Sequence, residues 1–369
     1  FLGKYRVLLT ANQEGYVVAL IQAAGTIVNM VVSIFLIYIG AGVLFVKAVA
    51  TGVYMLRLVL VKIYAKRKYP SLNFHAEPNE GALKQKNAAL LHQVVGIIVN
   101  NTDTTVLTIC LGAKSLLEVS VYGIYMMVVN AVNQLMTSFS NGLTAGFGEV
   151  IAKNEEETLK KSYSSYEYMY FVIMFIVIAC MGVLILPFVG VYTINLTDVQ
   201  YVRPVLGILF TLIVFMQNVR IPGLTIICAA GHYKETRYQA ILEAVINITV
   251  SLGLVWKFGM AGVLLGTVCS YGYRSFEIVF YTSRHLVKGC AKKSMFRIFR
   301  NVLVVALLCI VGIYVIPQNM ASFITWFLYA IGMGAVSVFT IVGVNYVVEP
   351  DEFKELVLRG KGIVNRKEK

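Results

Sequence analysis

The sequence predicts an all-α protein that crosses a membrane many times. Hydrophobic residues make up 58% of the 369 residues and charged residues only 14%, and the mean hydropathy is +0.74. A soluble domain of this length could not bury so much apolar surface. Apolar runs long enough to cross a bilayer recur ten times, and Lys and Arg gather in alternate connections. Together these observations predict a polytopic helical membrane protein.

Each predicted span is an apolar run of about 20 residues between polar connections. The ten runs cover residues 17–39, 42–64, 88–112, 117–143, 166–192, 203–228, 239–257, 260–283, 299–316 and 321–346. A polar stretch of mixed charge (65–87), which contains Pro70 and Pro78, separates the first two runs from the other eight. We expect this stretch to link two helical lobes on the cytoplasmic side.

The tail after the last run (347–369) is strongly basic and begins with EPDEF. Pro350 suits the first turn of a helix, and Asp351 and Glu352 are favourable near a helix N-terminus. We expect a short helix there, followed by a basic segment on the anionic inner leaflet.

The distribution of Lys and Arg predicts the orientation of the chain. One set of connections carries 24 of the 32 Lys and Arg residues: 1–16, 65–87, 144–165, 229–238, 284–298 with Arg300, and the tail. The opposite set carries only Lys114, Arg203 and Lys257. The positive-inside rule then places both ends of the chain in the cytoplasm. The net charge of +13 therefore reflects topology, and no nucleic-acid partner is predicted.

An ionisable cluster lies in the third predicted span. At about 100° per residue, His92, Asn100 and Asp103 fall within about a quarter turn of one another. A charge in hydrocarbon costs several kcal/mol, so this face must point toward protein or water. We predict a site for a coupling proton or cation at Asp103, with Asn100 and His92 as further candidates. The alternative is that Asp103 is neutral or paired and fixes helix packing, and that His92 is a satisfied histidine near the membrane surface.

The sixth predicted span contains the sequence FMQNVRIPG. Pro222 cannot donate a backbone hydrogen bond and clashes with the carbonyl of Asn218, which predicts a kink. A broken helix that lines a cavity exposes polar backbone groups able to bind an anion. Arg220 and Asn218 are therefore candidates for binding an anionic substrate group. The alternative is a kink needed only for packing, with Arg220 reaching the inner surface.

Two further basic residues lie deep in the second predicted span. Arg57 and Lys47 are candidates for lining a cationic cavity, and a guanidinium suits bidentate binding of phosphate oxygens. Lys62, near the inner end of the same span, is expected to reach the membrane surface.

Two acidic residues in the later spans have polar neighbours on the same helix face. Glu243 and Asn247 are one turn apart, and Arg274 and Glu277 are three residues apart. We expect packing and local pairing to explain both.

No motif for catalysis is present, and we expect a protein that is not an enzyme. The sequence lacks the Gly-rich phosphate loop followed by Lys that ATP-hydrolysing proteins use. The six cysteines show no paired spacing, so neither a disulfide, a metal site nor a cofactor is predicted. The predicted outer connections are too short to fold over a saccharide acceptor, which disfavours a membrane-embedded glycan ligase.

Several long segments resemble one family of transporters. They are HQVVGIIVNNTDTTVLTICLG, EVSVYGIYMMVVNAVNQLMTSFSNGLTAGFGEVIAKNEEE, ILPFVGVYTINLTDVQYVRP, AAGHYKETRYQAILEAVINITVSLGLVWKFGMAGVLLGTV and RHLVKG. In these segments the chain is similar to the polysaccharide-repeat (O-antigen and capsule, Wzx-like) flippases of the multidrug/oligosaccharidyl-lipid/polysaccharide exporter superfamily. The resemblance covers nearly the whole chain and rests on this pattern as a whole.

The resemblance implies a fold of fourteen helices, with two six-helix lobes and two additional helices. Residues 1–64 then correspond to the last two helices of the N-terminal lobe, and 65–87 to the lobe linker. Residues 88–283 correspond to the C-terminal lobe, 284–346 to the additional pair, and 347–369 to the cytoplasmic tail. We expect four further helices before Phe1.

The resemblance also implies a function: moving an undecaprenyl-pyrophosphate-linked oligosaccharide repeat between leaflets by alternating access. Arg57, Arg220, Lys47 and Asn218 would face the pyrophosphate, and H⁺ or Na⁺ would couple at Asp103. The partners implied are the lipid-linked oligosaccharide, the bilayer and the polysaccharide polymerase machinery.

Two other functions are consistent with the same sequence. A multidrug exporter of the same superfamily would share the topology, although a cavity of net positive charge would repel cationic drugs. A non-transporting membrane subunit of a polysaccharide assembly complex would tolerate substitutions at Asp103 and Arg220.

Overall fold

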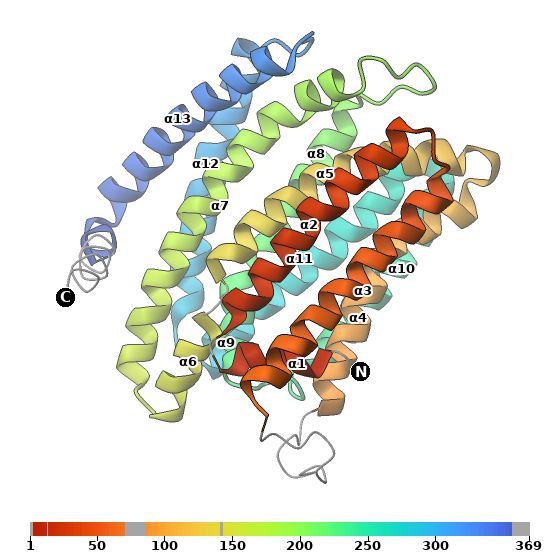
Figure 1. The fold of residues 1–369 in the computed structure, drawn as a ribbon. Coiled ribbons are helices and arrows are strands. Elements are labelled where there is room, and N and C mark those ends of the chain that lie inside the picture. The colour runs from red at the N-terminus through yellow and green to blue at the C-terminus, as the bar shows by residue number, and fades with distance from the viewer. Residues whose placement is uncertain (1–2, 13, 71–85, 141–142, 356–369) are drawn as a thin grey trace. The chain divides into compact units, whose positions relative to one another are not determined.

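The computed structural model describes residues 3–12, 14–70, 86–140 and 143–355, and these ranges contain helices and no strand (Figure 1). The chain divides into two compact units, Phe1–Ala82 and Leu83–Lys369. The boundary between them falls within 65–87, the stretch expected to link two lobes. The protein is an all-α polytopic membrane protein, as its composition predicts.

A long helix, or a pair of consecutive helices, occupies the position of each predicted span. The helices are α2 (Gly15–Tyr38), α3 (Val43–Lys68), α4 (Lys86–Cys110), α5 (Ser115–Ser140), α7 (Glu156–Tyr192), α8 (Pro204–Val219) with α9 (Ile221–Ala229), α10 (Arg237–Phe258), α11 (Met260–His285), α12 (Cys290–Val315) and α13 (Phe323–Val348). Within the described residues, eight segments are long and apolar enough to cross a bilayer by themselves. α4 and α11 are not among them, because each carries polar residues through its middle. The total of ten spans and the fourteen-helix plan stay predictions.

The first unit is a hairpin of α2 and α3, with a short helix, α1 (Gly3–Ala11), in contact with both. Tyr5 and Leu9 of α1 pack with Val18, Val61 and Ala65 to form a small apolar core. Most apolar side chains of α2 and α3 are exposed, as expected for helices that face lipid. α1 lies in the polar stretch 1–16, where the sequence analysis places no helix.

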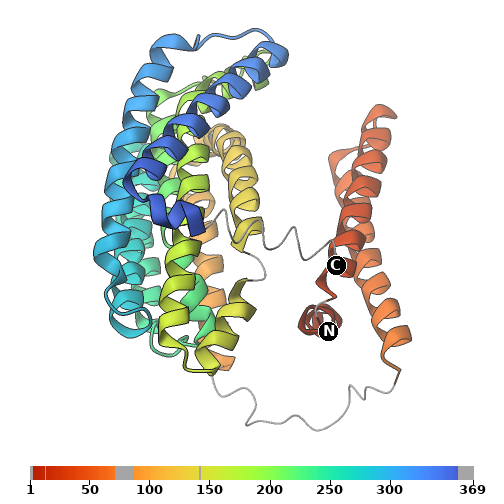
Figure 2. The same cartoon turned by 90° about the vertical axis from the view of Figure 1, so that its left-hand side faces the viewer.

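The second unit is a bundle in which successive long helices run in opposite directions. α7 is its most buried helix and packs against α8, α12 and α13 (Figure 2). α10 and α11 form a tight hairpin that also packs against α4. The hairpin turns at Gly259, whose φ of +56° lies in the left-handed region that glycine tolerates.

The second unit has one strongly basic end. α4, α7, α10 and α12 begin there, and α5, α9, α11 and α13 end there. Lys153, Lys160, Lys161, Arg237, Lys288 and Lys293 all lie at this end, which is called the basic end below. Lys114, Arg203 and Lys257 lie at the opposite end.

Two helices differ in length from the predicted spans. α7 starts at Glu156, ten residues before the predicted span, because EETLKK of the polar connection 144–165 continues into the same helix. α6 (Leu143–Ala152) occupies most of the remaining connector. The span predicted at 203–228 is broken at Arg220, with Pro222 in the first turn of α9. Pro187 lies inside α7, where no break separates two helices.

Candidate functional site

A half-open cavity of about 560 Å³ lies in the second unit toward the basic end, and part of its lining on α4, including Gln93 and Asn100, is exposed. Its walls come from α4, α8, α9, α10 and α11, together with the connection between α9 and α10. The polar lining residues are His92, Gln93, Asn100, Gln217, Arg220, Tyr233, Thr236, Glu243, Tyr271 and Arg274. The cavity therefore combines polar and charged side chains with an apolar remainder of its lining.

Arg220, Glu243 and Arg274 line this cavity and form, together with Glu277, a chain of alternating charges. The Glu243 carboxylate accepts a hydrogen bond from Arg220 through one oxygen, and its other oxygen lies 3.6 Å from Arg274 Nε. Arg274 Nη1 lies 2.5 Å from Glu277 Oε2. Arg274 and Glu243 are buried, with side-chain exposures of 3% and 9%. Two guanidiniums and two carboxylates thus balance one another, so this part of the cavity has no net positive charge.

Tyr271 of α11 connects the charged wall to α4. The Arg220 guanidinium lies over the Tyr271 ring, 4.5 Å from the ring centroid. The Tyr271 hydroxyl donates to Asn100 Oδ1 at 3.3 Å. The ring is 4% exposed, so it fills space between Arg220 and α4.

Asp103 lies one turn beyond Asn100 and is buried. Its Oδ1 accepts a hydrogen bond from Thr267 Oγ1 at 2.7 Å, and its Oδ2 accepts one from Tyr122 at 3.3 Å. No basic side chain pairs with Asp103 within the described residues. A buried carboxylate without a cationic partner is costly when ionised, so it favours binding of a proton or a cation.

More oxygen atoms surround Thr267. Asn247 of α10 donates to Thr267 Oγ1 at 3.0 Å, and its own Oδ1 is buried with no hydrogen-bond partner among the described residues. Ser251, one turn further along α10, donates to the carbonyl of Val263 at 3.1 Å. These oxygen groups are of the kind that bind hard cations. Among the described residues there is no group of three or more His, Cys, Asp and Glu suited to a metal ion.

The other two coupling candidates take different positions. Asn100 faces the cavity and Tyr271, as described above. His92 Nε2 lies 3.0 Å from the carbonyl of Tyr233 and 3.3 Å from Thr236 Oγ1. Asn100 thus lies one helical turn from Asp103, while His92 belongs to the part of the lining nearest the basic end, hydrogen-bonded to the connection between α9 and α10.

Of the two anion candidates near the kink, only Arg220 lines the cavity. Asn218 is 3% exposed and its amide is satisfied by its neighbours. It accepts from Tyr170 at 2.9 Å and donates to Asn133 Oδ1 at 3.0 Å and to the Val214 carbonyl at 2.8 Å. This geometry favours a packing role for Asn218 and separates it from the site.

The candidates of the second predicted span belong to the first unit. Arg57 of α3 donates to the carbonyl of Gly25 in α2 at 2.6 Å, and its Nε is buried without a partner among the described residues. No carboxylate pairs with it there. Lys47 is exposed near the start of α3. Arg57 therefore retains hydrogen-bond donors for an anion. No contact of Lys47 favours anion binding by this residue.

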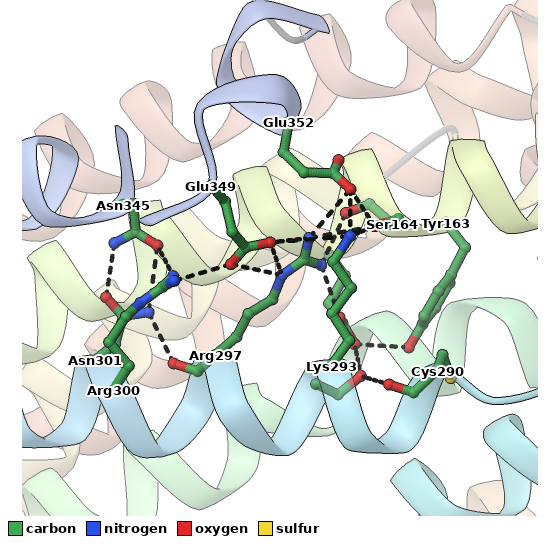
Figure 3. Close-up of polar contacts among 12 residues, drawn as sticks. Tyr163, Ser164, Cys290, Lys293, Arg297, Arg300, Asn301, Asn345, Glu349 and Glu352 are labelled. Atoms are coloured by element: carbon green, nitrogen blue, oxygen red, sulfur yellow. Dashed lines mark hydrogen bonds and ion pairs between the residues drawn. The ribbon is translucent and has the colours of Figure 1, made fainter. Parts of the chain in front are cut away.

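A second polar cluster lies at the basic end and joins α7, α12 and the segment after α13 (Figure 3). Arg297 of α12 is 1% exposed, and it contacts Glu167 at 3.0 Å and Glu349 at 2.7 Å. Glu349 also accepts from Arg300 at 2.9 Å, and Glu352 pairs with Lys293 at 2.5 Å. The groups in this cluster are matched in charge, so it serves to hold three segments together.

Several residues of the cavity and of the polar cluster at the basic end cannot be predicted as site residues from the sequence. From the sequence, Arg274, Glu243 and Asn247 are expected to serve packing and local pairing. In the structure, Arg274 and Glu243 line the cavity, and Asn247 donates to Thr267 beside Asp103. Glu243, Asn247 and Ser251 recur every four residues along α10, and this polar stripe is the signal that identifies the buried face. Nothing in the spacing of Glu167 and Arg297 indicates their contact, because 130 residues separate them.

A scan against protein-family models and a search of curated proteins both find no match to this sequence.

Proposed function

We propose that this protein is an ion-coupled flippase, which moves a polyprenyl-pyrophosphate-linked oligosaccharide across the plasma membrane by alternating access. The substrate would be an undecaprenyl-pyrophosphate repeat unit, used to make a cell-surface polysaccharide such as O-antigen or capsule. The proposal for the substrate rests on the sequence resemblance to Wzx-like flippases. The proposal for ion coupling rests on the site.

One observation carries the coupling. Asp103 is buried among hydroxyl and amide groups and has no cationic partner among the described residues. A carboxylate in this position changes its interactions when H⁺ or Na⁺ binds, since binding removes its net charge. Binding energy that differs between two conformations is what shifts the balance between them. Asp103 is thus the residue through which an ion gradient would drive transport.

Arg57 is the better of the two arginines for the pyrophosphate. Its charge has no carboxylate partner among the described residues, whereas Glu243 already neutralises Arg220. A guanidinium with free donors can bind phosphate oxygens in a bidentate manner. Arg220 would contribute only in a conformation that separates it from Glu243.

The test uses purified protein in liposomes with a fluorescent polyprenyl-pyrophosphate oligosaccharide. Movement is followed through quenching by a membrane-impermeant reagent, with an H⁺ or Na⁺ gradient imposed separately. We expect transport that Asp103→Asn abolishes and that Arg57→Ala slows by at least about tenfold, the loss typical for removing a charged hydrogen bond. Asp198→Asn, in an exposed connection at the opposite end, is the matched control.

Unchanged gradient-driven movement in Asp103→Asn would remove the coupling role. A second function, export of cationic drugs, is favoured by one feature: the Glu243 carboxylate and the aromatic ring of Tyr271 line the same cavity and both contact Arg220. Gradient-driven efflux of a cationic dye, with no movement of the oligosaccharide, would establish that function instead.

A further inference from the structure

The cavity and the buried carboxylate of Asp103 follow one another along α4. The cavity lining runs from Ala89 to Asn100, which is roughly 16 Å at 1.5 Å per residue. Asp103 lies one turn further and is not part of the lining. The cavity therefore ends just before the carboxylate.

Tyr271 and Asn100 occupy the position between the cavity and Asp103. Both line the cavity, and the Tyr271 hydroxyl is bonded to the Asn100 side chain. Tyr271 lies one helical turn from Thr267, which donates to Asp103. The tyrosine ring thus separates polar groups on the cavity side from polar groups around the carboxylate.

Beyond Asp103 along α4, the buried side chains are apolar. Val106 and Leu107 of the same helix are buried, and the ring of Tyr122 packs against Phe210 with a centroid distance of 5.5 Å. Crossing such a layer requires an ion to lose its hydration without polar replacement, which is costly. The cavity offers the more polar approach to Asp103, and it lies toward the basic end.

We propose that the cavity is a water-filled route by which the coupling cation reaches Asp103 from the basic end, and that Tyr271 closes this route at its inner end. The inference rests on the proposed coupling role of Asp103. Arg220, held by Glu243 and stacked on the ring, keeps Tyr271 in the closed position. Tyr271 is a positioning and gating residue, and opening requires its hydroxyl to leave Asn100.

Thiol accessibility tests the route without relying on transport. Cys228 lines the cavity and reports on its hydration, in a background where the other five cysteines are Ser. Asp103→Cys, in a background with all six replaced, reports on the inner site. A membrane-impermeant, positively charged methanethiosulfonate is added separately to each face of membrane vesicles, and modification rates are measured by mass spectrometry.

From the basic end we expect rapid modification at Cys228 and slow modification at Asp103→Cys. Adding Tyr271→Ala should accelerate the reaction at Asp103→Cys by at least about tenfold, which corresponds to a barrier lowered by about 1.4 kcal/mol. Tyr271→Phe, which keeps the ring but loses the bond to Asn100, should give a smaller acceleration. Phe276→Ala, an exposed aromatic on the same helix, should change neither rate.

Three results would overturn the route. They are an unreactive Cys228, equal rates at Asp103→Cys with and without the Tyr271 substitutions, and modification of Asp103→Cys only from the opposite end. Because Cys228 reactivity is measured in every Tyr271 variant, loss of the native cavity is detected directly, and Tyr271→Phe supplies the result if Tyr271→Ala does not fold. If the labelling pattern is as expected but the flipping assay fails, the proposed substrate is wrong and the proposed cation route is retained.

Discussion

At the scale of single residues, Glu243 is the centre of the charged wall, because one carboxylate serves both Arg220 and Arg274. Glu243→Gln leaves two buried guanidiniums with one fewer counter-charge, and we expect it to lower the free energy of unfolding by about 3 kcal/mol. Arg220→Gln leaves Glu243 near Arg274, so the expected loss is smaller, about 1–2 kcal/mol. Thermal unfolding in detergent, followed with a thiol-reactive dye, measures both.

Glu235→Gln provides the matched control, since Glu235 is exposed in the nearby connection between α9 and α10. It should leave the unfolding temperature unchanged. If Arg220→Gln proved more damaging than Glu243→Gln, the carboxylate would not be the shared partner that the geometry indicates.

The residue scale also shows where sequence reasoning succeeds and fails. Asp103 is identifiable because an acidic residue amid a long apolar run is rare and must face protein or water. Its donors, Thr267 and Tyr122, are not identifiable, because hydroxyl groups occur throughout membrane helices and most bond to their own backbone. Arg220 is identifiable as a polar residue beside a kink, but its pairing with Glu243 depends on where the junction of α8 and α9 lies relative to α10.

At the scale of elements, the approach of α10 and α11 depends on two glycines spaced by four residues. A Cβ on Gly266 would collide with the backbone of Ser251, and one on Gly262 would collide with the carbonyl of Leu254. Small residues at this spacing let membrane helices pack backbone against backbone. The same contact positions Asn247 against Thr267 and so supports the surroundings of Asp103.

Gly266→Ala is therefore expected to destabilise the protein by about 2 kcal/mol, the usual cost of overpacking. Gly272→Ala is the matched change on the same helix, because a Cβ there meets no atom within 4 Å. It should be neutral or stabilising by up to about 1 kcal/mol through helix propensity. The unfolding midpoints of the two variants are measured under the same conditions and compared. Similar midpoints would exclude a tight α10–α11 contact.

The segment after α13 is a second element whose role follows from its contacts. Residues 350–355 are helical, as expected from EPDEF, and Glu349 and Glu352 face α12 and α7. Burial alone would raise the pKa of Glu349, but hydrogen bonds and charge from Arg297 and Arg300 outweigh burial and lower it. The pKa of Glu352 is lowered in the same way, with Lys293 and Ser164 outweighing burial.

These shifts set the direction of a pH effect. Because the folded pKa values lie below the ordinary value of 4.5, the two carboxylates stabilise the docked segment fully above that pH. Their contribution is lost as the pH falls below about 4.5 and the carboxylates are protonated. We expect hydrogen exchange in residues 349–355 to increase in that range, beyond the change in intrinsic exchange rate.

The variant Glu349→Gln with Glu352→Gln should show rapid exchange in this segment already at neutral pH. Asp351→Asn is the control, since Asp351 is exposed on the same segment. Protection that stays constant through this pH range would show that apolar contacts, and not the carboxylates, hold the segment.

At the scale of the whole molecule, the fold class and the positions of the helices are predictable. Both depend on the length of apolar runs, which is visible in consecutive residues of the sequence. α4 and α11 are helices at two of the predicted positions, although both are too polar to be among the eight segments apolar enough to cross a bilayer, and their crossing stays a prediction. The clusters are not predictable, because they join distant segments. Arg297 and Glu349 are 52 residues apart, and no periodicity within either helix indicates their contact.

The orientation of the molecule is the prediction on which the direction of transport and of ion entry depends. The charge distribution predicts that the basic end lies in the cytoplasm, because Lys and Arg are retained on that side during insertion. With all six native cysteines replaced by Ser, Asn195→Cys and Glu235→Cys place single thiols in exposed connections at opposite ends of the second unit. A membrane-impermeant maleimide should label Asn195→Cys in intact cells and Glu235→Cys only in inside-out vesicles. The reverse pattern would place the basic end and the cavity near it on the outer side, and a coupling cation would then reach Asp103 from outside the cell.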